Sequence, residues 1–185
     1  MGKTFNPPDA FADALDTFKV SAFRFEGLQT YLIEEEREEF QRFLTGWIPK
    51  TCPDGLKDWC SDIAAATQSG KTYQRVRTII FPLNEYTRFE VICGYQFSEP
   101  AGEVIQLLEE APLKTGNTVT VIPDFWIFDD TLCFVMDYDQ AGAFLGVRKV
   151  ADNQLPFFVL IKHKALEQSI DLRHSKTWQQ LFPSA

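Results

Sequence analysis

The stretch Asp124–Asp139, DFWIFDDTLCFVMDYD, places two runs of large apolar residues on either side of a short polar segment. Runs of aromatic and aliphatic residues around a polar turn predict a β-hairpin. With Asp130 and Thr131 as the two turn residues, the ladder would reach Asp124 opposite Asp137. Neither face of this ladder is polar, so we expect a central pair of strands with carboxylates at its open end.

Length and composition predict one globular domain over residues 1–185. The chain is 45% hydrophobic and 24% charged, and its 185 residues are enough to bury a full core. The formal net charge of −8 and the pI near 4.8 disfavour direct binding to nucleic acid or to an anionic membrane surface, because phosphate neutralisation needs a concentrated basic surface. This sign of charge fits a cationic partner, or another protein with a basic patch.

Signals for a membrane span, a metal or a nucleotide cofactor are missing from the sequence. No run of about 18 apolar residues occurs, and the first residues hold no apolar segment of signal-peptide length, so we expect a cytoplasmic protein. The four cysteines have no CxxC spacing and the two histidines lie far from them, which favours buried free thiols over a structural zinc site. Neither GxGxxG nor a GxxxxGK motif followed by Ser or Thr is present, so no nucleotide cofactor is predicted.

The rest of the chain predicts helices before, between and after strands. Strands are expected at 20–26, 72–81, 103–108 and 142–150, and helices at 9–18, 33–44, 54–70, 84–95 and from 156 onward, with a turn at 114–117 leading into 119–122 and the hairpin. Asn84 would cap its helix and Glu99–Gly102 would break it. The run Leu155–Ile161 is also compatible with a strand. This order predicts an α+β fold, a mostly antiparallel sheet with a C-terminal meander that is packed by helices, rather than a doubly wound α/β fold.

Two arginines point the same way in the predicted strand 72–81, because strand residues two apart share a face. We expect the following charged residues to gather around them: Arg75 and Arg77 of that strand, Arg88 and Glu90 of the next helix, and Asp124, Asp129, Asp137 and Asp139 around the hairpin. Arginines and carboxylates in an apolar core must pair, since an unpaired buried charge destabilises the fold. One interpretation is a salt-bridge network that fixes strand register, with the hairpin carboxylates as the partners of the arginines.

A second interpretation makes the same residues a ligand site. Arg75, Arg77 and Arg88 would form a fork for a phosphate or a carboxylate, because guanidinium groups bind such anions bidentately. Glu90 or Asp124 would then serve as acid or base.

Metal binding and nucleophilic catalysis have weaker support. Asp124, Asp137 and Asp139 would offer oxygen ligands to Mg²⁺ or Ca²⁺, but no EF-hand spacing accompanies them, so no metal site is predicted. His163 and His174 lie in the C-terminal segment, where a lone helical histidine is more often a surface or packing residue than a base.

The predicted loop 46–55 carries the other reactive or aromatic candidates. Cys52 and Cys60 flank this exposed loop and could react, although no sequence feature lowers their pKa. Trp47 and Trp59 lie close to it and could anchor a protein partner.

Several segments occur in an order that points to a family. SAFRFE, a helix ending in FLTG, YQRVRTI followed by Pro, YTRFE, AGE, DFWIFDD and MDYDQAG together resemble an uncharacterised domain family that is common in actinobacteria. The resemblance covers about residues 18–150. Members of that family look like small proteins often encoded beside helix-turn-helix regulators, so the resemblance implies a bacterial protein with such a neighbour and implies no activity.

These observations support two function hypotheses. The first is a non-enzymatic, cytoplasmic regulatory or protein-interaction module that works with a DNA-binding partner such as a helix-turn-helix regulator. The second is an enzyme or ligand-binding domain for a phosphorylated or carboxylated small molecule that uses the arginine fork. They differ in whether the arginines are paired and closed off or converge on an open pocket.

Overall fold

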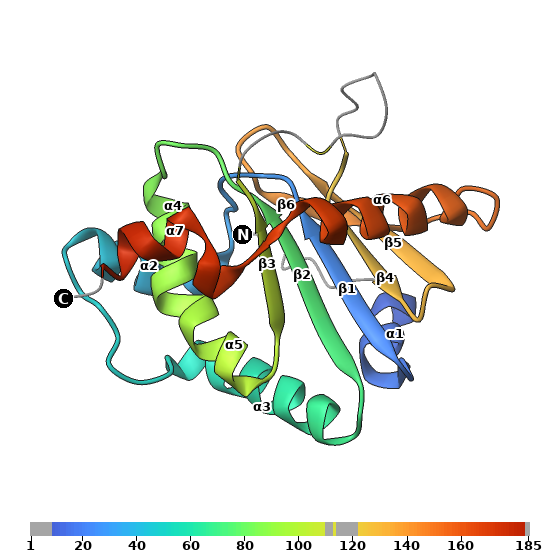
Figure 1. Cartoon of the computed structure of the whole chain (residues 1–185), viewed down its shortest axis with the longest axis horizontal. Coiled ribbons are helices and arrows are strands. Elements are labelled where there is room, and N and C mark those ends of the chain that lie inside the picture. The colour runs from blue at the N-terminus through green and yellow to red at the C-terminus, as the bar shows by residue number, and fades with distance from the viewer. Residues whose placement is uncertain (1–8, 110–112, 114–121, 184–185) are drawn as a thin grey trace.

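The computed structural model describes residues 9–109, 113 and 122–183, which build one seven-stranded sheet with helices on both faces (Figure 1). The strands lie in the order β6-β5-β4-β1-β2-β3-β7. Their bounds are β1 Ser21–Glu26, β2 Thr72–Thr78, β3 Val104–Leu108, β4 Phe125–Phe128, β5 Leu132–Tyr138, β6 Phe144–Lys149 and β7 Ile170–Asp171. The predicted turn at 114–117 and residues 119–121 of the segment after it lie outside the described residues.

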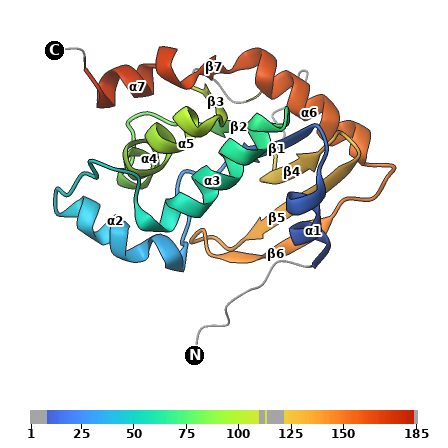
Figure 2. The same ribbon diagram turned by 90° about the horizontal axis from the view of Figure 1, so that it is seen from below.

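Helices fill the connections within the first half of the chain and follow the last long strand. Their bounds are α1 Asp9–Thr17, the 3₁₀ turn η1 Glu34–Glu36, α2 Arg37–Leu44, α3 Asp54–Gln68, α4 Glu85–Phe89, the π-helix η2 Glu90–Tyr95, α5 Gln96–Ala101, α6 Leu155–Gln168, the 3₁₀ turn η3 Leu172–His174 and α7 Lys176–Leu181. Helix α6 crosses one face of the sheet, and α1 and α3 lie against the other (Figure 2). Within the described ranges no helix is long and apolar enough to span a membrane.

Alternation along the central strand β1 decides what each face of the sheet buries. Phe23 and Phe25 pack with Phe158 and Ile161 of α6 in one core cluster. Ala22 points to the opposite face, where it joins the cluster under α1. Residues further along that second face, beyond the apolar cluster, are charged, and they form the site described below.

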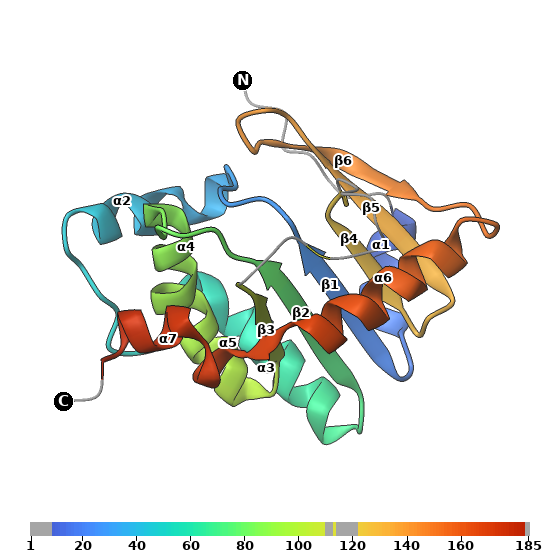
Figure 3. The same ribbon diagram turned by 45° about the horizontal axis from the view of Figure 1, so that its top comes forward.

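The sheet combines a short parallel centre with antiparallel flanks. β1 pairs with β2 and β2 pairs with β3 in parallel, while the other four pairings are antiparallel. Parallel neighbours require a crossover, which α2 and α3 supply between β1 and β2, and which α4 to α5 supply between β2 and β3. Figure 3 shows the antiparallel meander β4-β5-β6 with α6 in front of the sheet and α1 behind it. The predicted α+β class, with a mostly antiparallel sheet and a meander, is confirmed.

The hairpin forms, but the predicted register is wrong by one residue. Phe128 pairs with Leu132 and Phe125 with Val135, so the connection has three residues instead of two. Asp129 and Asp130 both adopt the left-handed conformation, with φ of 54° and 55°. The wider turn exists because Asp129 is held by contacts outside the hairpin, and no local pattern shows those contacts.

The helix after β2 is longer than predicted. Asn84 does cap it, since its side chain accepts a hydrogen bond from the Thr87 backbone N–H at 2.7 Å. The predicted break at Glu99–Gly102 is wrong in position, because the helix continues through Pro100 and ends only at Gly102, whose φ of 118° is left-handed. After the last long strand, Leu155–Gln168 forms the helix α6, so the strand alternative for Leu155–Ile161 is excluded.

Candidate functional site

Two parallel strands bring four charged side chains together at the centre of the sheet. The register of β1 and β2 places Arg24 beside Arg75 and Glu26 beside Arg77. Residues two apart on a strand share a face, so all four side chains project toward the same side. That side is covered by the helices between β1 and β3, which removes these charges from bulk water.

Glu26 is the common partner of the three arginines. Its side chain is 0% exposed, and its Oε1 lies 2.8 Å from Nη2 of Arg24 and 2.8 Å from Nη1 of Arg75. Its Oε2 lies 3.3 Å from Nη1 of Arg77 and accepts a 2.8 Å hydrogen bond from the Tyr95 hydroxyl. Burial alone would raise the pKa of Glu26, but the surrounding arginines outweigh burial and hold that pKa well below its usual range.

Two further carboxylates complete the charge balance of the cluster. Nε of Arg75 donates to Oε1 of Glu103 at 2.8 Å, and Arg77 forms a short ion pair with Glu90. With Glu26 they give three carboxylates for three guanidinium groups, as a set of buried charges requires. Burial raises the pKa of Glu90 to about 7 even though the neighbouring Arg77 lowers it.

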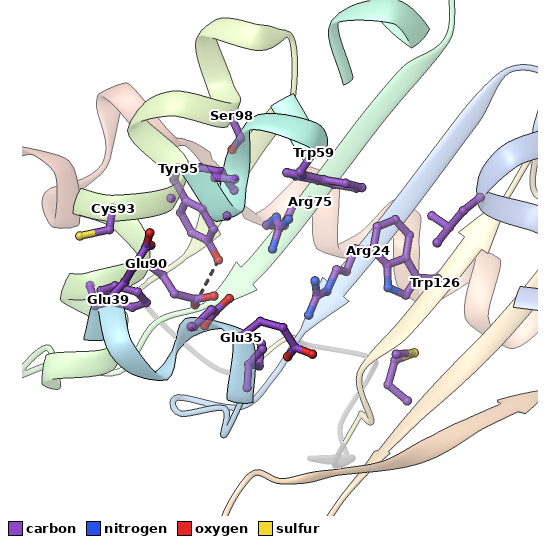
Figure 4. Close-up of a pocket in the computed structure, with 18 of the residues that line it drawn as sticks. Arg24, Glu35, Glu39, Trp59, Arg75, Glu90, Cys93, Tyr95, Ser98 and Trp126 are labelled. Atoms are coloured by element: carbon purple, nitrogen blue, oxygen red, sulfur yellow. Dashed lines mark hydrogen bonds between the residues drawn. The ribbon is translucent and has the colours of Figure 1, made fainter. Parts of the chain in front are cut away.

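The π-helix η2 places two members of this cluster. A π-helix bonds each residue to the one five positions away, which widens the turn, and such segments occur frequently at functional sites. Glu90 and Tyr95 are the first and last residues of η2, and the Tyr95 hydroxyl lies 3.5 Å from Oε2 of Glu90, as the dashed line in Figure 4 shows. Both side chains reach Arg77 from this wider turn.

A cavity of about 400 Å³ lies beside the charge cluster (Figure 4). Arg24 and Arg75 form its polar floor, and aromatic walls from several elements surround it. The aromatic lining residues are Phe11 of α1, Trp59 of α3, Phe89 of α4, Tyr95 of η2 and Trp126 of β4. The wall is preformed, because Trp59 meets Trp126 edge to face with ring centroids 6.3 Å apart.

Arg24 and Arg75 each have a guanidinium nitrogen that the charge cluster leaves unpaired. Nε of Arg24 is buried and has no hydrogen-bond partner among the described residues. Nε and Nη1 of Arg75 are taken by Glu103 and Glu26, whereas its Nη2 donates to no residue in the described part of the chain. Arg24 remains 20% exposed, and its Cζ lies 5.5 Å from the centroid of the Trp126 ring. Each arginine is thus neutralised by the cluster and keeps one guanidinium nitrogen without a hydrogen-bond partner among the described residues.

Part of the rim of the cavity is acidic. Glu35 and Glu36 of η1 and Glu39 of α2 line it. Glu36 accepts a 2.6 Å hydrogen bond from the Tyr86 hydroxyl, and burial raises its pKa. The cavity therefore offers both guanidinium groups and carboxylates.

The cavity holds no activated nucleophile among the described residues. Cys93 lines it, but burial raises the pKa of this thiol to about 12. Neither histidine is among the lining residues, since His163 belongs to α6 and His174 to η3. No group of three or more possible metal ligands occurs in the described ranges.

The structure brings together three of the predicted site residues and separates a fourth. Arg75, Arg77 and Glu90 lie in the charge cluster as described. Arg88 does not join them, because it is 42% exposed on the outer side of α4 and faces Glu85 at 3.8 Å. Arg24 takes the place of Arg88 as the third arginine, so the predicted fork of Arg75, Arg77 and Arg88 is not formed.

The hairpin aspartates are not the partners of the arginines, which corrects the sequence-based pairing. Asp124 accepts a short hydrogen bond from the Tyr31 hydroxyl and a 2.8 Å bond from the Gly27 N–H. The other three lie elsewhere: Asp129 accepts backbone N–H groups of Lys19, Val20 and Ser21, Asp137 pairs with Arg148, and Asp139 accepts from the N–H groups of Ala141 and Ala143. The reason is geometric, since Asp129, Asp137 and Asp139 belong to turns and strand ends that face solvent.

Sequence reasoning missed Glu26, Glu103 and Tyr95 as members of the cluster. The alternation in SAFRFE places Arg24 and Glu26 on one face of its strand, and this is the signal that could have identified them. Nothing local showed that this strand lies parallel to β2, and that pairing is what makes Glu26 the partner of Arg75 and Arg77.

Comparisons with known proteins agree with the fold and leave the activity open. The model of a protein family described as a domain of unknown function, DUF6879, matches residues 9–175. No curated protein matches the chain. Among solved structures, the chain is similar to a phospholipase D family member, Nuc from Salmonella typhimurium, with 13% sequence identity, a TM-score of 0.51 and coverage of 88% of each chain. At that identity the likeness shows a shared fold alone.

Proposed function

We propose that this chain, which belongs to the DUF6879 family, is a non-enzymatic binding domain for a small carboxylate with an apolar or aromatic body. The observation that carries the proposal is the pair of arginines, Arg24 and Arg75, that line an aromatic cavity while Glu26 holds their guanidinium groups in place. Ligand pockets are commonly apolar with a few convergent polar groups that fix orientation, and this cavity has that composition.

A carboxylate fits the floor because of the geometry of the two arginines. Planar guanidinium groups donate parallel hydrogen bonds to a carboxylate, and such charge-assisted bonds are among the stronger ones in proteins. Glu26 already fixes both guanidinium groups, so little rotamer freedom is lost when a ligand binds. The ligand body would then contact Trp59 and Trp126.

The acidic rim selects against ligands of higher negative charge. Glu35 and Glu39 line the cavity together with Arg24 and Arg75, so the two cations are opposed by at least as many carboxylates. A phosphate with two negative charges is repelled more strongly than a single carboxylate in this setting. The volume of about 400 Å³ also suits a small ligand, near the lower end of the usual range for pockets.

A thermal-shift screen tests this proposal with benzoate, phenylacetate and indole-3-acetate, each compared with its amide and with phenyl phosphate. A ligand present at a hundred times its Kd raises the stability by about 2.7 kcal/mol, which is measurable. We expect a shift with one or more carboxylates, loss of that shift in an Arg24→Met variant that still unfolds cooperatively, and an unchanged shift in Arg88→Met, whose arginine is not among the lining residues. Stabilisation by the amides to the same degree as by the acids would exclude the arginine floor as the recognition element.

A second candidate function is the regulatory interaction module, and it is favoured by an acidic surface on η1 and α2. Glu34, Glu35 and Glu38 are exposed there, on a chain whose net charge is −8. We propose as partner a protein with a basic patch, such as a helix-turn-helix regulator encoded beside it in a bacterial genome, with the complex in the cytoplasm. Opposite charge patches speed association and select the partner.

Titration of the purified chain with a regulator encoded beside it tests the second candidate. We expect a complex whose affinity falls with added salt and falls further in the double variant Glu34→Lys, Glu38→Lys. Arg24→Met should leave that complex intact, because its side chain belongs to the cavity. Absence of binding at low salt would count against the interaction module and leave the ligand proposal standing.

A further inference from the structure

Two partly exposed thiols lie next to each other at the start of α3, outside the cavity. Cys52 belongs to the loop between α2 and α3, and Cys60 lies on α3. Their sulfur atoms are 3.8 Å apart, and both residues are free thiols in this structure. Neither takes part in the charge cluster or in the proposed ligand site.

The two cysteines differ in how firmly the fold holds them. Cys60 follows Trp59, whose ring packs edge to face on Tyr73 with centroids 5.1 Å apart, so this turn of α3 is fixed to the sheet. Cys52 precedes Pro53, the extended residue that leads into the helix, and therefore lies on the loop side of the boundary. A disulfide has an S–S distance of about 2.05 Å, so the sulfurs must approach by about 1.8 Å, a movement that the loop side can supply.

A groove of about 460 Å³ gives access to Cys52. Arg42, Trp47 and Lys50 line it together with Cys52, and the Arg42 guanidinium stacks 4.0 Å above the Trp47 ring. Glu39 and Asp54 also line the groove, so its formal charges balance, and the two cations beside the aromatic face can pair with individual carboxylates of a small peptide. Oxidised glutathione is a disulfide that carries such carboxylates, and its size is compatible with partial entry into such a groove.

We propose that Cys52 and Cys60 form a reversible intramolecular disulfide by exchange with a small anionic disulfide, represented by oxidised glutathione, that docks in this groove. The Cys52 thiolate attacks one sulfur of oxidised glutathione, which forms a mixed disulfide and releases one glutathione thiolate. Cys60 then gives its proton to solvent and attacks the Cys52 sulfur, which forms the Cys52–Cys60 bond and releases the second glutathione. Two protein thiols are oxidised and one glutathione disulfide is reduced to two thiols, so atoms and electrons balance.

The order of the two steps follows from the surroundings of the thiols. Burial, together with the adjacent Cys52 thiol, raises the pKa of Cys60 to about 12, so Cys60 keeps its proton at neutral pH. Cys52 faces the groove and meets the reagent first. Once the mixed disulfide exists, the short distance to Cys60 favours closure over attack by an external thiol.

Closure of this disulfide ties the loop to the wall of the cavity. Gly55, Leu56 and Trp59, which follow Cys52 within the first turns of α3, line the cavity, and Glu39 lines both the cavity and the groove. The disulfide is thus a redox-sensitive link between the groove and the cavity. Its formation does not depend on whether the cavity binds a carboxylate.

Incubation of the folded chain with oxidised glutathione, followed by alkylation and non-reducing tryptic mapping, tests the proposal. Lys57 lies between the two cysteines, so a Cys52–Cys60 bond joins the tryptic peptides 51–57 and 58–71, and dithiothreitol should separate them. Cys93 and Cys133 serve as internal controls, because both are buried and should be alkylated only after denaturation. We expect the linked pair as the main product and a loss of two hydrogen atoms in the intact mass.

Two variants keep the test decisive. Cys60→Ser should stop at the mixed disulfide with glutathione on Cys52, whereas Cys52→Ser should react at least tenfold more slowly than the unchanged chain, because Cys60 is the poorer nucleophile. If the unchanged chain also stops at a mixed disulfide, or if linkage appears only under denaturing conditions, the intramolecular disulfide is refuted.

Discussion

Glu26→Gln is the substitution to which the structure assigns the largest effect on stability. The side chain is 0% exposed and contacts three arginines. Glutamine has nearly the same volume, so no cavity forms, and the change removes the negative charge and replaces one acceptor oxygen by an amide NH₂ group. Three guanidinium groups would then face two carboxylates, Glu90 and Glu103, in the interior of the protein.

The expected magnitude follows from the cost of an uncompensated buried charge. Removal of one partner from a buried ion pair typically destabilises a protein by about 3–5 kcal/mol. A domain of this kind has a total stability of about 5–15 kcal/mol, so the loss is a large part of it. With a urea slope of about 2 kcal/mol per molar, the unfolding midpoint should fall by about 2 M.

Urea unfolding followed by tryptophan fluorescence measures this shift, because Trp59 and Trp126 lie next to the cluster. The matched control is Glu34→Gln, which removes a carboxylate from an exposed pair with Arg37 at 3.3 Å and should change stability by less than about 1 kcal/mol. Equal midpoints for Glu26→Gln and Glu34→Gln would refute the reasoning, since they would show that the buried arginines do not require Glu26.

Four further substitutions test the structure. Because burial raises the pKa of Glu90 from 4.5 to about 7, this group binds its proton more tightly in the folded state, and its contribution to stability falls as the pH rises through that window. Glu90→Gln should therefore remove that part of the pH dependence, seen as a smaller difference between urea midpoints at about pH 5 and about pH 8 than in the unchanged chain. Asp129→Ala takes the acceptor from three backbone N–H groups and should cost about 1–3 kcal/mol, while Asp137→Ala, which opens an exposed pair, should cost less than about 1 kcal/mol in the same urea assay. At Gly142 the backbone φ is 88°, and a Cβ would lie 2.5 Å from the Thr30 carbonyl oxygen, so Gly142→Ala is strained. Calorimetry should show a Tm lower by at least about 2 °C, and an unchanged Tm would contradict the close approach of these two loops.

Much of the fold could be predicted because local patterns decide it. The strands of the hairpin and of SAFRFE are too rich in aromatic and β-branched residues to be loops, and both are buried in the sheet. The register could not be predicted, because the left-handed Asp129 depends on backbone N–H groups of residues 19–21, more than 100 positions earlier in the chain. A two-residue turn is the more common hairpin connection, and only those distant contacts favour the longer one.

Only part of the candidate site could be predicted from local sequence patterns. Strand alternation correctly placed Arg75 and Arg77 on one face, and burial made carboxylate partners obligatory. The identity of those partners depends on which strand lies next to β2 and on its direction. The sequence pattern favoured the hairpin aspartates because they are numerous, whereas the parallel pairing with β1 supplies Glu26.

The sharing of Glu26 by three arginines also limits how this family can diverge. A mutation of any one member leaves a buried charge without its counterpart, so single changes at these positions should be rejected by selection on stability. Simultaneous replacement of all members by apolar residues of similar volume can instead be neutral or stabilising, as buried ion pairs in other proteins have shown. Sequences of the DUF6879 family should therefore retain Arg24, Glu26, Arg75 and Arg77 together or lose them together. Retention in members whose cavity is filled by larger side chains would indicate a structural role, and joint loss with the cavity would indicate that the charges are kept for a ligand.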